Sequence, residues 1–60
     1  MSEEVEITHV HVTGTETSKK AISNGADDID RYLNAVNNDD VVQVVVRRAS
    51  DNALLGERRR

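Results

Sequence analysis

Two histidines two positions apart have the residue type and spacing of metal ligands. His9 and His11 lie in a segment rich in β-branched residues, and on a strand both imidazoles would project from one face, roughly 7 Å apart. That spacing suits Zn or Ni, but a complete transition-metal site needs three or four ligands and the chain has no cysteine. The remaining ligands would be carboxylates or histidines of a second copy. The simpler interpretation is a pair of polar residues on a partly exposed face.

A glycine turn followed by hydroxyls and two lysines has the groups that bind an anion. We expect this turn to lead into a helix, whose free N–H donors and positive end attract negative charge. The spacing is not that of a Walker loop, and capping of the helix by Thr15 or Thr17 explains the same residues. The candidate anion-binding residues are Gly14, Thr15, Thr17, Ser18, Lys19 and Lys20.

Five arginines in the last third of the chain form a candidate basic patch. A hairpin that turns at residues 50–52 would place the ends of its two strands side by side, and clustered guanidinium groups bind phosphates. An acidic surface on a partner subunit is an equally good target, because the net charge is −3 and Tyr32 is the one aromatic side chain available for stacking on bases. The patch comprises Arg47, Arg48, Arg58, Arg59 and Arg60.

The chain offers little for catalysis. It has no cysteine nucleophile, and no spacing suggests a Ser-His-Asp arrangement. Asp27, Asp28 and Asp30 fall largely on the solvent side of the expected helix, with no apolar pocket around them. We therefore expect a protein that is not an enzyme.

The apolar run Val41–Val46 predicts the central strand. Valines point to both of its faces, so both faces need cover. One amphipathic helix can cover one face, which leaves the other for a second copy of the chain. By alternation, one set of side chains is Val42, Val44 and Val46 and the other is Val41, Gln43 and Val45, and either set is a candidate for self-association.

The expected fold is α+β, a β-α-β-β unit with a three-stranded sheet and one helix on one face. Residues 5–12 read as the first strand, with either a bulge near Thr8-His9 or two moderately apolar faces. A helix follows the glycine turn, and a strand over residues 53–58 returns after the second valine-rich strand. The first two strands would be parallel, joined by the helix. The apolar stripe of the helix is Ile22, Ala26, Ile29, Leu33 and Val36.

Size and composition indicate one small domain over residues 1–60, with 1–4 and 59–60 frayed. A chain of 60 residues buries only about 60% of its unfolded surface, and without cysteine no disulfide can supplement its core. Oligomerisation or a bound ligand is the expected supplement. No apolar run approaches the roughly 18 residues that cross a bilayer, so we expect a cytoplasmic protein without a membrane partner. The first half of the chain is acidic and the second half basic.

The turn and helix resemble the corresponding stretch of the dodecins, small β-α-β-β proteins that assemble into hollow shells and store flavin. The matching residues are Val12–Ser18, Ala21 and Ala26–Arg31, within elements that follow the same order over residues 5–46. The resemblance implies this topology and a self-associating sheet. Dodecins stack flavin against a tryptophan near the start of the second strand, where this chain has Val41 or Val42.

Three functions follow, in order of preference. The first is a non-enzymatic, self-associating module, at least a dimer, that acts through assembly or binding of a protein partner. The second is an oligomeric carrier of a small ligand, flavin-like or anionic, in which an interface between copies makes the pocket. The third is nucleic-acid binding through the arginines near the end of the chain.

Overall fold

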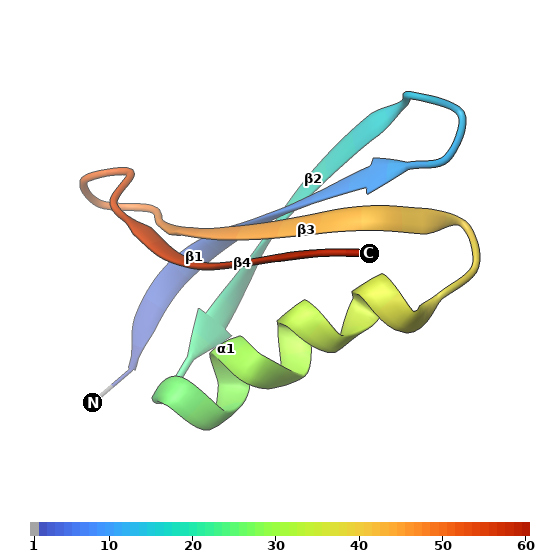
Figure 1. The fold of residues 1–60 in the computed structure, drawn as a ribbon. Coiled ribbons are helices and arrows are strands. Elements are labelled where there is room, and N and C mark those ends of the chain that lie inside the picture. The colour runs from blue at the N-terminus through green and yellow to red at the C-terminus, as the bar shows by residue number, and fades with distance from the viewer. Residues whose placement is uncertain (1) are drawn as a thin grey trace.

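The chain folds into one antiparallel sheet with a single helix on one face (Figure 1). In the computed structural model, residues 2–60 are described. The four strands lie in the order β2-β1-β3-β4, and each is antiparallel to its neighbours. The elements are β1 (Glu3–His11), β2 (Glu16–Ser23), α1 (Ala26–Leu33), the 3-10 helix η1 (Asn34–Asn37), β3 (Val41–Arg48) and β4 (Leu54–Arg59).

The ends of the described chain lie within the sheet. Glu3 and Glu4 belong to β1, Arg59 belongs to β4, and the Arg60 N–H donates to the Val42 carbonyl at 2.9 Å. The expected fraying at residue 1 lies outside the described residues. Among residues 2–60, no helix has the length and apolar character needed to cross a membrane.

The expected β-α-β-β unit with three strands is wrong, because residues 16–23 form a strand instead of the first half of a helix. A four-residue loop, residues 12–15, folds this strand back on β1. Gly14 takes a φ of 88°, its N–H donates to the His11 carbonyl, and the His11 N–H donates to the Thr15 carbonyl. This left-handed glycine closes an antiparallel hairpin. The order is therefore β-β-α-β-β, and β1 and β3 are antiparallel rather than parallel.

The helix begins at Ala26, directly after Gly25, and Asp28 of its first turn reaches back to the residue before that glycine. A carboxylate oxygen of Asp28 accepts the Asn24 backbone N–H at 2.8 Å, and its other oxygen pairs with Arg31. This reach backwards from the third helical position resembles a capping box. The Asn24 hydrogen bond and the Arg31 interaction hold the pKa of Asp28 below its usual value. The element is thus a helix of eight residues, extended by η1.

The core lies between the helix and the middle of the sheet. Its buried side chains come from β1, β3, α1 and η1, and Val5, Val44 and Val46 are each 0% exposed. Gly56 on β4 lets the helix approach closely, since a Cβ there would lie 3.0 Å from side-chain atoms of Ile29 and of Leu33. The buried cluster comprises Val5, Ile7, Leu33, Val36, Val41, Val44 and Val46.

A β-bulge on β3 corrects the expected division of its valines. Val10 pairs with Gln43 and His11 pairs with Val41, so Val42 is the extra residue. Because of the bulge, Val41 lies on the core face of the sheet with Val44 and Val46. Simple alternation had predicted it on the same face as Val45. On β1 the register runs without interruption from Val5 to Val10, so the irregularity is not at Thr8-His9.

The sheet face opposite the helix, which we call the open face, is mostly polar. Strand alternation places it on the residues that lie between the core positions. On β1, β2 and β3 its residues are Glu4, Glu6, Thr8, Val10, Glu16, Ser18, Lys20, Ile22, Gln43, Val45 and Arg47.

Candidate functional site

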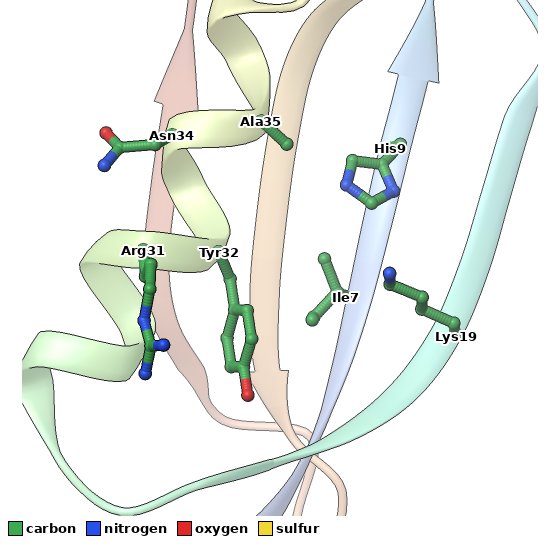
Figure 2. Close-up of a pocket in the computed structure, with 7 residues that line it drawn as sticks. All are labelled: Ile7, His9, Lys19, Arg31, Tyr32, Asn34 and Ala35. Carbon is green, nitrogen blue, oxygen red and sulfur yellow. The ribbon is translucent and has the colours of Figure 1, made fainter.

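A cavity of about 400 Å³ lies between the β1–β2 hairpin and the helix (Figure 2). In Figure 2 the side chains of Ile7, His9 and Lys19 project from the strands toward the side of Tyr32 that faces the sheet, whereas Asn34 points away from them. The cavity is lined by Ile7, His9, Lys19, Arg31, Tyr32, Asn34 and Ala35.

The register of the hairpin places the strand residues of this site. Ile7 and His9 share the helix-facing side of β1, and Lys19 is the β2 partner of Ile7, so it faces the same way. Ile7 is 1% exposed and forms an apolar floor. The Tyr32 hydroxyl donates to the Ile22 carbonyl on β2, which ties the helix to the strand that carries Lys19.

The cavity is positively charged in a protein of net charge −3. Lys19 and Arg31 both line it, and none of its lining residues is acidic. Arg31 is 74% exposed and pairs with Asp28, which lies outside the lining, while none of the ion pairs recorded within residues 2–60 involves Lys19. The ammonium group of Lys19 is therefore the principal uncompensated charge at this site.

His9 is held in its neutral form by the same surroundings. Partial burial, the nearby charge of Lys19 and then that of His11 lower the pKa of His9 below its usual value. A neutral imidazole both donates and accepts a hydrogen bond. His9 therefore offers the cavity a donor near neutral pH, and a bound anion would favour its protonation.

The residues predicted to bind an anion were expected at the N-terminus of a helix. They lie on the β1–β2 hairpin instead, and no helix begins among them. Gly14 and Thr15 are in the turn and next to it, and the other four lie on β2. Lys19 and Lys20 point to opposite faces of the strand, so only Lys19 reaches the cavity. Thr17 is hydrogen-bonded to His11, and Ser18 to Thr8 on the open face.

Sequence reasoning missed Arg31 and Tyr32 as site residues. Both were assigned to a helix that covered the sheet, and a tyrosine there reads as ordinary packing. Lys19 lies near Tyr32 only because β2 pairs with β1. The one signal in the sequence was a lysine pair where a helix start disfavours cations, which indicates that the segment is not a helix start.

The two histidines lie together, as their spacing predicts. Their ring centroids are 6.4 Å apart, and His11 Nε2 is 3.0 Å from the Thr17 hydroxyl oxygen. Within residues 2–60, no group of three or more histidine, cysteine, aspartate or glutamate side chains gathers closely enough to hold a metal ion. A metal site here stays a prediction that needs ligands from a second copy.

The five arginines do not form one patch. Arg48 pairs with Glu3 and Asp51, and Arg58 pairs with Asp30 and donates to Asn34. The Arg60 guanidinium donates to the carbonyls of Val36, Asn38 and Asp39, where the 3-10 helix ends. The side chains of these three arginines thus bind groups of their own chain.

The remaining two arginines of the predicted patch, Arg47 and Arg59, are set apart along the sheet. In the strand register Arg47 lies opposite Glu6 on β1. Arg59 lies opposite Gln43, which is four positions from Arg47 on β3. At the rise of a strand, four positions separate the two by about 13 Å. Three of the arginines bind groups of their own chain and the other two are far apart, so the five guanidinium groups do not form a single phosphate-binding surface.

The valine-rich strand is divided between the two sheet faces. Val41, Val44 and Val46 are in the core under the helix, whereas Val45 and Gln43 lie on the open face. Val45 is 9% exposed and is flanked across the strands by Thr8 and Glu57, and Gln43 Nε2 donates to Glu57 at 3.1 Å. On β1, β2 and β3 the open face therefore presents three apolar residues, Val10, Ile22 and Val45, among a larger number of polar ones.

Comparison of the chain with models of known protein families, with curated proteins and with solved structures found no match.

Proposed function

We propose that this chain is a non-enzymatic binding module that holds a small organic anion in the cavity between the β1–β2 hairpin and the helix. The observation that carries the proposal is the charge of the lining: Lys19 and Arg31, beside the neutral imidazole of His9 and without a carboxylate, in an acidic protein. The proposal keeps the anionic small ligand of the second function expected from the sequence, but it places the pocket within one chain instead of at an interface between copies. A cytoplasmic location remains the prediction that accompanies it.

The shape and lining of the cavity suggest the chemistry of the ligand. Ile7, Ala35 and the ring of Tyr32 provide apolar contact, and Lys19 and His9 provide donors on one side. Binding pockets commonly combine an apolar lining with a few polar groups that fix orientation. A phosphate ester or carboxylate attached to a small ring or short chain fits this arrangement, with its charge near Lys19.

The test is a titration with phenyl phosphate, benzoate and inorganic phosphate, followed by NMR of backbone amides and of the His9 ring. We expect chemical-shift changes at Ile7, His9, Lys19 and Tyr32. The pKa of His9 should rise as the anion binds, because a nearby negative charge favours the imidazolium. Phenyl phosphate should bind more tightly than inorganic phosphate, since the ring of phenyl phosphate contacts the apolar floor.

Lys19 and Lys20 provide a matched pair of variants. Lys19→Gln removes the charge that lines the cavity and should weaken binding about tenfold, equivalent to ~1.4 kcal/mol. Lys20→Gln makes the same change one residue away on the open face and should change affinity less than about twofold. Equal effects of the two variants, or no shift at the cavity residues at any anion concentration, would refute the proposal.

A further inference from the structure

The strand β2 is an exposed edge of the sheet. It pairs with β1 alone, and of its eight residues only Ser23 is buried. An edge strand presents a row of unpaired N–H and C=O groups that can pair with another strand. The question is therefore whether the residues of β2 favour a particular partner.

The hairpin geometry shows which backbone groups of β2 point outward. The His11 N–H donates to the Thr15 carbonyl, and hydrogen-bonded pairs alternate along an antiparallel ladder. Thr17, Lys19 and the following odd-numbered residues therefore bond to β1. The outward N–H and C=O groups belong to Glu16, Ser18, Lys20 and Ile22, and of these the Ile22 carbonyl already accepts the Tyr32 hydroxyl.

One register of self-pairing matches both these groups and the charges of β2. When Ser18 faces Ser18 of a second copy in an antiparallel pair, Glu16 of each copy faces Lys20 of the other. The one Ser18–Ser18 pair and the two Glu16–Lys20 pairs all join residues whose backbone N–H and C=O groups point outward. Oppositely charged cross-strand pairs stabilise a sheet, and like charges opposite each other destabilise it.

Neighbouring registers and the other sheet edge fit less well. Shifting the two-fold axis to Lys19 places Lys19 opposite its own copy, and shifting it to Lys20 does the same for Lys20. Pairing of β2 with β4 would join two edges that both carry a net positive charge, since β4 has Arg58 and Arg59 against one glutamate. A closed dimer is therefore favoured over an open filament.

We propose that two copies of this chain pair through β2, antiparallel about Ser18, to form a continuous sheet of twice the width. The two-fold axis is perpendicular to the sheet, so both helices lie on the same face. Thr17 of each copy then lies opposite Lys19 of the other, beside the cavity that Lys19 lines. This inference does not rest on the anion-binding proposal, although the partner's Thr17 adjoins that site.

Charge exchange between two positions tests the register. By sedimentation velocity from about 5 µM to 1 mM, we expect the native chain to form a dimer. Glu16→Lys and Lys20→Glu should each weaken the dimer about tenfold or more, because each brings like charges together twice across the axis. The double variant Glu16→Lys/Lys20→Glu should restore the affinity to within about threefold, since the charges are again opposite.

A backbone variant separates this pairing from other contacts. Ser18→Pro removes an outward N–H, which an edge strand tolerates because that group has no partner within the sheet. We expect a monomer with an unchanged circular dichroism spectrum. A native chain that stays monomeric at 1 mM, single charge variants without effect, or a double variant that is not restored would each overturn the proposal, and a monomer would identify the lysines of β2 as protection against edge pairing.

Discussion

The covered part of the sheet and its β2 edge have opposite roles. In the part formed by β1, β3 and β4, the helix covers one face, Ile7, Val44 and Val46 are buried, and Gly56 admits the helix at close range. At the other edge, β2 is exposed along almost its whole length and carries Lys19 beside a cavity. The difference shows that the single helix stabilises only part of the sheet, and that the uncovered part has the accessible charges and backbone groups.

The largest expected effect contrasts two isoleucines, one from each environment. Ile7→Ala removes a side chain that is 1% exposed and should cost about 2–5 kcal/mol of the free energy of unfolding. A core of this size supplies roughly 3–5 kcal/mol in total, so the variant should be largely unfolded. Ile22→Ala removes a side chain that is 52% exposed and should change stability by about 0.5 kcal/mol or less.

Urea denaturation followed by circular dichroism measures both isoleucine variants. Equal losses of stability in the two variants would contradict the division of the sheet into a covered part and an exposed β2 edge.

A second prediction concerns the close approach of the helix to β4. Gly56→Ala adds a methyl group 3.0 Å from atoms of Ile29 and Leu33, and overpacking of this kind costs about 1–3 kcal/mol. The midpoint of thermal unfolding should fall. The double variant Gly56→Ala/Leu33→Val should recover part of the loss if the clash is the cause, because Leu33 Cδ1 is one of the atoms in contact. A single variant as stable as the native chain would show that the helix can move away from β4 at little cost.

The smallest effect concerns His9 on β1, at the boundary between the covered part and the β2 edge. Its pKa is lowered by partial burial and by Lys19, so the unfolded chain binds the proton more readily than the folded one. Stability should therefore fall as the pH drops below about 6.5 and level off once the pH is below the folded-state pKa. Lys19→Gln should raise the pKa of His9 toward its usual value, and Lys20→Gln should leave it in place.

An NMR titration of the imidazole C–H signals measures this pKa in the native chain and in both lysine variants. An unshifted His9 in the native chain, or the same change in both variants, would contradict the placement of Lys19 beside the imidazole.

Local pattern was sufficient for several elements of the fold. The valine-rich run at Val41–Val46 lies within β3, because β-branched residues fit the extended backbone of a strand. The stripe residues Ile29, Leu33 and Val36 pack in the core, since their helical spacing continues through α1 and η1. An α+β chain with a helix on one sheet face was correctly anticipated, as was a returning strand near residues 53–58.

The same periodicity misled where it extended back to Ile22. Its spacing continues the helical stripe, yet Ile22 lies on β2 and is half exposed. Thr17, Ser18 and Ile22 have acceptable strand propensity, and the hairpin turn at Gly14 supplies β1 as a partner for the whole segment. Tertiary pairing outweighed a weak local helical signal.

The sequence by itself determined which segments are apolar, where the chain turns at Gly14, and that two histidines would share a strand face. Only the tertiary structure decided that Lys19 would meet Tyr32 and Arg31 at one cavity, that a bulge would move Val41 into the core, and that β2 would be left as an exposed edge. The physical reason is that side-chain spacing encodes the local conformation, whereas strand order and register depend on partners distant in the sequence. A shift of one residue in register exchanges the two faces of a strand.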